Sequence, residues 1–275
     1  MIERISRSVY VECDAPGCCS HSFVETGEGI VMIDTPVVPS AATAWRREIE
    51  RHGTCRYIIN MEPHIDHFGG GSFFPGVVVA RDETRERIAA TPLEEMVQML
   101  AAGAADSLPL PDTFRFRLPE ITFSENLTLH TGDRTFEIIE MPGHTACQTV
   151  VYFPEERVLF AADTIANKKV PSLHEALPFE WLDSLRKLQK LDCELVVPGH
   201  GAVGDARLIL GMATALETAM DSVKGAIDKG LSLREAKDRI TVFEDYGDFL
   251  PGKEFRRWLN RINVGRLYQL LKEPT

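Results

Sequence analysis

The sequence predicts an α/β protein in which two β-sheets pack face to face and helices cover their outer surfaces. Short runs rich in β-branched and aromatic residues come in two batches, at about 8–80 and 121–161, with helical patterns between and after them. No internal repeat, low-complexity run or Pro/Ser-rich linker divides the 275 residues, which are enough to bury a sizeable core. This order favours an αββα sandwich over a doubly wound sheet.

The first half of the chain alternates short strands with helical patterns. The turn Gly27-Glu28-Gly29 joins two apolar runs as a hairpin. Residues 82–105 have a helical pattern, and Thr91-Pro92-Leu93-Glu94 predicts a break there, because it has the form of a capping box with proline at the first helical position. Strands are expected at 8–12, 22–25, 30–34, 57–60 and 77–80, and a further helix at 39–51.

The second half changes from strands to helices. We expect residues 1–204 to form the sandwich, with 82–105 as a helical insertion, and residues 205–275 to pack on it as a helical extension. Covering the site and forming a homodimer interface are alternative roles for that extension. Strands are expected at 121–129, 134–140, 149–153, 158–161 and 195–197, and helices at 179–191, 205–230 and 253–272, with a capping box at Ser232-Leu233-Arg234-Glu235.

Composition excludes several classes of protein. The chain has 30 Lys and Arg against 41 Asp and Glu, and this net charge of −11 argues against nucleic-acid binding, which needs a basic face. No run approaches the roughly 20 apolar residues that span a bilayer, and the N-terminus has no apolar signal core. The six cysteines match no structural zinc spacing. We therefore expect a cytoplasmic protein with reduced thiols that acts on a small molecule.

The densest set of metal-ligand side chains follows the strand that ends at Asn60. Glu62, His64, Asp66 and His67 lie within six residues of one another, and the glycines after them let the backbone pass close to a site. The first three alternate, so in an extended loop they face one side, while His67 faces elsewhere and can serve a second ion. A strand end delivers side chains with the fixed geometry that such a site needs.

Three further candidates occupy the same kind of position. His144, Asp163 and His200 each follow an apolar run and precede a turn that contains glycine or threonine. A single histidine after a strand is more often a core or surface residue than a ligand. Four segments placed alike reverse that expectation, so the sequence predicts a metal site.

These segments resemble the metallo-β-lactamase superfamily, whose signature is His-x-His-x-Asp-His, followed by a His, an Asp and a final His in later loops. The resemblance runs from about residue 9 to residue 201 and includes Ile33-Asp34-Thr35 and Pro142-Gly143-His144-Thr145. It implies an αββα sandwich with a dinuclear site at one edge of the sheets. It is specific for fold and metal, and it does not name a substrate.

Carried over by position, the resemblance implies two metal sites joined by one carboxylate. It places Glu62, His64 and His144 in site one, Asp66, His67 and His200 in site two, and Asp163 between the two ions. The ions are expected to be two divalent metals, with zinc first and iron or manganese as alternatives. Asp66 or Asp163 would orient the nucleophile and move a proton.

Glu62 departs from the pattern, because the family usually has histidine there. If Glu62 binds, three carboxylates and a hydroxide offset the whole +4 charge of two divalent ions, and the cluster should lower the pKa of its water less. If Glu62 does not bind, site one is weak, and Glu62 acts as a base or the enzyme uses site two alone.

The leading hypothesis is a metallo-hydrolase that uses a metal-bound hydroxide to cleave an acyl bond of a small lactone, thioester or amide. Lys168 and Lys169, shortly after Asp163, either contact an anionic substrate group or are solvated loop lysines. A diiron redox or oxygen-dependent enzyme on the same fold is one alternative, motivated by the carboxylate-rich ligand set. A degenerate, non-catalytic binding protein is the other.

Overall fold

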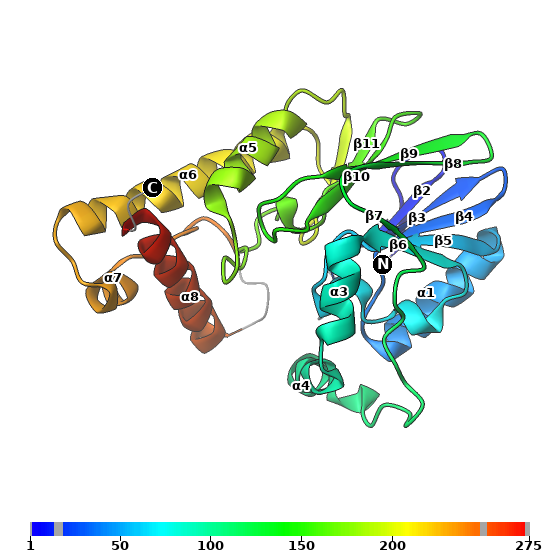
Figure 1. The fold of residues 1–275 in the computed structure, drawn as a ribbon, viewed down its shortest axis with the longest axis horizontal. Helices are drawn as coiled ribbons and strands as arrows, with labels where there is room; N and C mark the ends of the chain where they lie inside the picture. The colour runs from blue at the N-terminus through cyan, green and yellow to red at the C-terminus, as the bar shows by residue number, and fades with distance from the viewer. Residues whose placement is uncertain (1, 14–18, 248–251, 273–275) are drawn as a thin grey trace.

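The computed structural model describes residues 2–13, 19–247 and 252–272, and two mixed sheets face each other between helices (Figure 1). The first sheet runs in the order β1 (Glu3–Arg4), β2 (Val9–Glu12), β3 (His21–Thr26), β4 (Gly29–Ile33), β5 (Cys55–Ile59), β6 (Val77–Arg81) and β7 (Ile121–Phe123). The second runs β12 (Leu195–Val197), β11 (Val158–Phe160), β10 (Thr149–Phe153), β9 (Arg134–Glu140) and β8 (Leu127–Thr131). The predicted fold class is confirmed.

Three apolar layers hold the sandwich together. Alternate residues of β4 point to opposite faces, so Ile30 and Met32 pack toward α1 while Val31 and Ile33 pack toward the second sheet. The outer face of the second sheet packs on α5 and on the C-terminal helices. The helices are α1 (Pro39–His52), α2 (Ile65–Phe68), α3 (Asp82–Ala90), α4 (Leu93–Gly103), α5 (Pro178–Leu188), α6 (Arg207–Asp228), α7 (Leu233–Arg239) and α8 (Lys253–Lys272).

Strand directions bring several strand ends to one edge. β4, β5 and β6 are mutually parallel in the first sheet. In the second sheet β9 and β11 both run antiparallel to β10, and β12 runs parallel to β11. The carboxyl ends of β9, β11 and β12 therefore lie together, and loops leaving them can meet.

Two local expectations were wrong. The single strand expected at 121–129 is two strands in different sheets, because the polar turn residues 124–126 carry the chain from β7 across to β8. The helical break at 91–93 is present, but Thr91 ends α3 and makes no side-chain cap for α4. The second capping box is confirmed, since the Ser232 hydroxyl accepts from the Glu235 N–H and the Glu235 carboxylate accepts from the Ser232 N–H.

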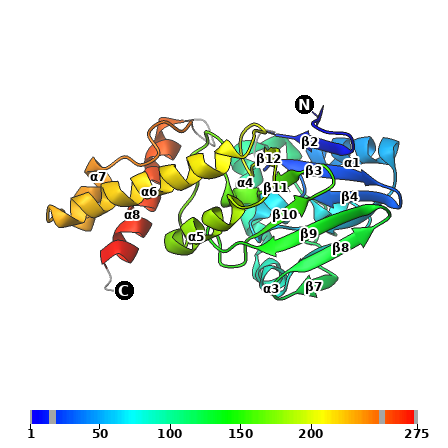
Figure 2. The same cartoon turned by 90° about the horizontal axis from the view of Figure 1, so that it is seen from above.

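The C-terminal helices extend one apolar cluster beyond the sheets. Met212 and Leu216 of α6 are buried in the same cluster as Leu185 of α5 and Leu267 of α8. Figure 2 shows α6, α7 and α8 together at one end of the molecule. Among the described residues, no helix combines the length and apolarity needed to cross a bilayer.

Candidate metal centre

The predicted ligands come together where the loops leave the strand ends. Glu62 and His64 lie in the loop after β5, and Asp66 and His67 lie on the short helix α2 that follows. His144 follows β9, Asp163 lies in a single helical turn, Ala162–Thr164, after β11, and His200 follows β12.

One triangle of ligand atoms joins Glu62, His64 and His144. His64 Nδ1 lies 3.1 Å from Glu62 Oε2 and 3.1 Å from His144 Nε2, and the Glu62 and His144 atoms are 3.7 Å apart. Ligands on a tetrahedral zinc ion, at about 2.0–2.2 Å from it, are separated by roughly 3.3 Å. The spacing of these three atoms fits one ion of that size.

A second group joins Asp66, His67 and His200. Asp66 Oδ2 lies 3.4 Å from His200 Nε2 and 4.0 Å from His67 Nε2. Asp163 lies between the two groups: its Oδ1 is 3.4 Å from His67 Nε2 and 3.3 Å from His200 Nε2, and its Oδ2 is 3.5 Å from His144 Nε2. Each carboxylate oxygen of Asp163 therefore faces a different group.

Buried atoms without aligned hydrogen bonds make the cluster suitable for a metal ion. Glu62 Oε1, His67 Nε2 and Asp163 Oδ1 are buried and make no well-aligned hydrogen bond to a described residue, although Glu62 Oε1 lies only 2.7 Å from His67 Nε2. The three side chains belong to one cluster of potential ligand atoms that lie within 4.8 Å of one another. Because a buried polar atom without a partner is costly, and these donors are imidazole and carboxylate, a divalent cation satisfies them.

The charges of the cluster depend on one another. Burial alone would raise the pKa of Glu62, but the imidazoles of His67 and His64 hold that pKa below its usual range. Burial alone would lower the pKa of His200, yet the carboxylates of Asp163 and Asp66 raise it to about 10. Without a cation, the cluster therefore keeps its carboxylates ionised by holding protons on imidazoles.

Comparison with known proteins decides the family. A family model described as the metallo-beta-lactamase superfamily matches residues 16–200. The chain belongs to the metallo-β-lactamase superfamily. The ligand clusters suit the divalent metals that this superfamily binds.

Individual relatives share only a modest part of their sequence with this chain. The 2,4-dinitroanisole O-demethylase subunit alpha of Nocardioides sp. is 29% identical over 185 residues, which are 64% of this chain and 51% of that protein. Hydroxyacylglutathione hydrolase of Bartonella henselae is 32% identical over 131 residues, which are 47% of this chain and 50% of that protein. The chain thus spans about half the length of these curated relatives. A metallo-β-lactamase structure from Pontibacter korlensis has a TM-score of 0.66 at 21% identity, covering 79% of this chain and 98% of that one, which shows the same fold.

Within this superfamily fold, buried contacts behind the cluster orient its residues. Asp34 Oδ2 lies 2.7 Å from His67 Nδ1 and so turns His67 Nε2 toward the cluster. The other oxygen of Asp34 accepts from the N–H of Met61, at 2.9 Å. The Cys19 thiol donates to the carbonyl of Asp66, at 3.1 Å. The sequence analysis quoted the Asp34 segment only as part of the resemblance and assigned Cys19 no role.

Glu175 is a residue that the sequence analysis missed. Its Oε1 lies 2.7 Å from His64 Nε2 and 2.7 Å from an Arg87 Nη2 on α3. Burial alone would raise the pKa of Glu175, but these two hydrogen bonds lower it to about 2. The neighbouring His174 is exposed, and its ring centroid lies 5.2 Å from that of His64. Only the long-range fold reveals this arrangement, since no local motif marks Glu175.

The backbone at Gly199 passes close to the Asp163 carboxylate, and this close approach shapes the site. A side-chain carbon on Gly199 would lie 2.0 Å from Asp163 Oδ1 and 2.6 Å from the carbonyl carbon of Ala162. Only glycine lets the chain before His200 pass behind the Asp163 carboxylate. The glycine therefore allows the β11 and β12 loops to present both ligands to one cluster.

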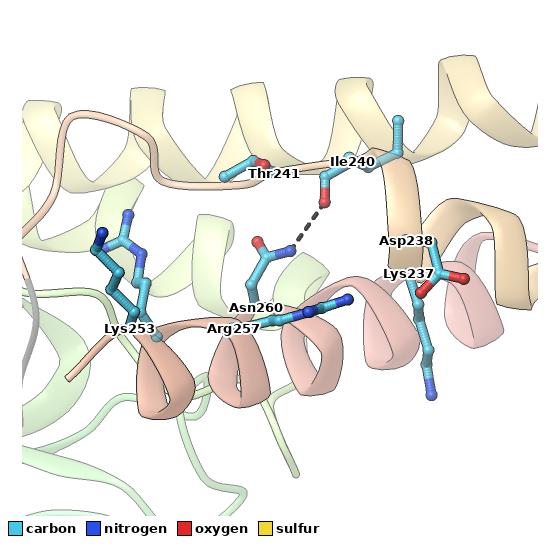
Figure 3. Close-up of a pocket in the computed structure, with 8 residues that line it drawn as sticks. Lys237, Asp238, Ile240, Thr241, Lys253, Arg257 and Asn260 are labelled. Atoms are coloured by element: carbon cyan, nitrogen blue, oxygen red, sulfur yellow. Dashed lines mark hydrogen bonds between the residues drawn. The ribbon is translucent and has the colours of Figure 1, made fainter.

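Away from the candidate metal centre, a cavity of about 340 Å³ lies between α7 and α8, and the predicted ligands do not converge on it (Figure 3). Its Asn260 donates to the carbonyl of Ile240 and thereby joins α8 to the end of α7. Lys237 points away from Lys253 and Arg257 in the same view. This cavity is a seam between helices whose described lining is mainly basic and contains none of the predicted metal ligands.

Proposed function

We propose that this chain is a metal-dependent hydrolase that cleaves the acyl bond of a small molecule, such as a lactone, thioester or amide. The observation that supports it is the pair of ligand groups joined by the two oxygens of Asp163. The Bartonella relative is named as a hydrolase, which supports the same reaction class.

Seven residues would hold two divalent ions, with zinc as the first choice. They are Glu62, His64 and His144 for one ion, Asp66, His67 and His200 for the other, and Asp163 for both. Divalent ions held by these residues would lower the pKa of a bound water and polarise a carbonyl oxygen. In the overall reaction, the hydroxyl of water joins the acyl carbon, the bond to oxygen, sulfur or nitrogen breaks, and the leaving group takes the proton.

Asp66 and Asp163 are the residues proposed to orient the attacking water and accept its proton. Both carboxylates face the cluster, and Asp66 lies toward the open cavity. Burial alone would raise the pKa of Asp163, but His200 and His67 hold it well below the usual range, so the carboxylate is ionised and can accept a hydrogen bond from a water that it orients.

The proposed role of Glu62 is that of a ligand in place of the usual histidine. Its Oε2 completes the first triangle and its Oε1 lies 2.7 Å from His67 Nε2. With Glu62 as a ligand, three carboxylates offset the charge of the two divalent ions. A cluster with histidine at that position would have only two carboxylates and would be more positive. We expect a weaker Lewis acid that favours activated acyl bonds.

Metal analysis of protein purified without added metal, combined with a screen of lactones, thioesters and β-lactams, tests the proposal. Stoichiometric divalent metal and anaerobic hydrolysis support it. Stoichiometric iron with turnover only under O₂ would replace it with redox chemistry.

The variant Glu62→His tests whether the chain is instead a degenerate binding protein. We expect loss of both metal and hydrolysis, because the buried carboxylate already contacts His64 and His67. Metal content and initial rates are the readouts. Gain of metal and activity over the native chain would favour the degenerate alternative.

A further inference from the structure

A cavity of about 450 Å³ opens onto the candidate metal centre, and α8 forms part of its wall. His64, Asp66, Asp163 and His200 lie on its polar side. The other sides come from the helical insertion, the segment 170–175 and the C-terminal helix. A substrate that reaches the cluster must therefore contact all three.

The wall contributed by α8 is apolar and partly aromatic. Phe255, Trp258 and Leu259 all line the cavity, and their spacing of three and four residues places them on one helix face. The Phe255 and Trp258 ring centroids are 5.5 Å apart with planes inclined by 35°. Trp258 remains 55% exposed, so much of its indole surface is open to a ligand in the cavity.

The opposite wall is compatible with the same kind of ligand. Met99 of α4 adds apolar surface to the cavity from the helical insertion, and Val170, which shares a core cluster with Leu259, extends the apolar surface beside α8. A methionine side chain adapts its shape and makes favourable contacts with aromatic rings. An apolar ring between α4 and α8 would thus meet apolar atoms on both sides.

Apart from the candidate metal centre itself, the described walls of the cavity offer no unpaired Lys or Arg side chain to an anionic substrate. Among the described lining residues, Arg87 is the one Lys or Arg, and its guanidinium is paired with Glu175 at 2.7 Å. Glu95 adds a further carboxylate to the rim. Lys168, which the sequence suggested for an anionic group, lies instead over the Tyr246 ring at 5.7 Å and does not line the cavity. Burying a substrate anion here would leave its charge without a partner from the walls.

The apolar wall is fixed to the segment that carries His174 and Glu175. Asn263 of α8 accepts from the N–H of Leu173 through Oδ1 and donates to the carbonyl of Pro171 through Nδ2, both at 2.8 Å. Arg266 donates to the carbonyl of Ala176. These bonds hold α8 at a set distance from the cluster, so its rings form a preorganised surface.

We propose that α8 supplies the binding surface for an aromatic ring, and that the substrate is an uncharged aryl ester or a closely related aryl acyl compound. This inference rests on the proposed hydrolase function. Trp258 and Phe255 select the substrate by contacting its ring, while the cluster acts on the acyl group.

Matched esters and variants test the inference. For phenyl acetate, Trp258→Ala should lower kcat/KM about tenfold, mainly through KM, as expected when one apolar contact is lost. Methyl acetate, which has no ring, should be unaffected, and Trp258→Phe should retain most of the phenyl acetate rate. Leu210→Ala is the control, because Leu210 is a similarly exposed apolar residue of α6 that does not line the cavity. Equal losses for both esters, no loss for either, or faster cleavage of 4-carboxyphenyl acetate than of phenyl acetate would overturn the inference.

A binding measurement separates this inference from the proposed function. Acetophenone resembles phenyl acetate but cannot be hydrolysed, and calorimetry can follow its binding without turnover. Binding that weakens about tenfold in Trp258→Ala supports the aryl surface even if every ester resists hydrolysis. Ester hydrolysis combined with no detectable acetophenone binding, or with acetophenone binding that Trp258→Ala leaves unchanged, overturns the aryl surface while leaving the hydrolase intact.

Discussion

Glu175 links a cluster histidine to the helical insertion, and its removal should weaken metal binding. The carboxylate accepts from His64 Nε2 and leaves Nδ1 facing Glu62 and His144. Outer contacts of this kind change metal affinity by about 10–100-fold. We expect Glu175→Ala to weaken metal binding by that order and Glu175→Gln, which keeps an acceptor, to weaken it less, as measured by competition with a chelator.

A second carboxylate variant shows whether the loss of metal affinity is specific to Glu175. Glu94 is an exposed carboxylate at the start of α4, so Glu94→Ala should leave metal affinity unchanged. If Glu175→Ala bound metal as tightly as the native chain, Glu175 would have no positioning role.

Metal loading should become tighter as pH rises. Burial alone would lower the pKa of His64, but Glu62 and Glu175 raise it to about 10, and the carboxylates around His200 raise its pKa to about 10 as well. Both imidazoles are therefore protonated in the metal-free protein at pH 7, and a bound metal must displace those protons. Affinity should rise about tenfold per pH unit for each proton released, up to the region of these pKa values.

Calorimetry in two buffers of different ionisation enthalpy measures this proton release. We expect at least one proton per ion at neutral pH, because the pKa of His67 is raised along with those of His64 and His200. A metal-binding heat that is the same in both buffers would show that the imidazoles are already neutral, contrary to the charges inferred for the cluster.

At the residue scale, sequence spacing identifies side chains that follow strands, but it does not show contacts across the chain. The run from Glu62 to His67 is local, and its spacing alone indicates ligand chemistry. Glu175 contacts a histidine 111 positions away and an arginine 88 positions away, and no local pattern encodes either distance. The outer contacts are therefore visible only in the folded chain.

At the element scale, α8 fixes the segment that borders the candidate centre. Asn263 is fully buried and satisfies two backbone groups of that segment. Asn263→Ala leaves a buried N–H and a buried carbonyl without partners, at a cost of about 1–3 kcal/mol for each. We expect a lower free energy of unfolding in urea and, because Glu175 shifts with its segment, weaker metal binding.

Asn126→Ala provides the control for Asn263. Asn126 accepts one hydrogen bond from the Glu140 N–H and is exposed, so its loss should change stability little. Equal destabilisation by the two variants, or unchanged metal affinity in Asn263→Ala, would contradict a positioning role for α8.

Elements with strong periodic patterns were predicted well, and connections were not. α8 begins and ends at the expected residues 253 and 272, because a long amphipathic helix is encoded by its own sequence. The crossing at 124–126 was missed although these polar residues favour a turn, because the assignment of β7 and β8 to different sheets depends on pairing partners that the local sequence does not show.

At the scale of the whole molecule, alternating strands and amphipathic helices explain the three apolar layers. The inner faces of the two sheets meet each other, and α1 and α5 cover the outer faces. The sequence predicted this architecture because each element carries its own burial pattern. Covering the site and forming a homodimer interface were the two roles expected for the C-terminal helices, and α8 lines the same cavity as His64. The sequence alone left both roles open, because the position of a terminal helix depends on packing over the complete fold.

The central claim is that the folded chain binds two divalent ions between its two ligand groups. Metal content of the native protein, measured by elemental mass spectrometry after dialysis from excess zinc, tests it most directly. The account predicts about two ions per chain, with His64→Ala and His200→Ala each retaining fewer. A native chain that retains no metal after saturation, or variants that retain as much as the native chain, would contradict the account.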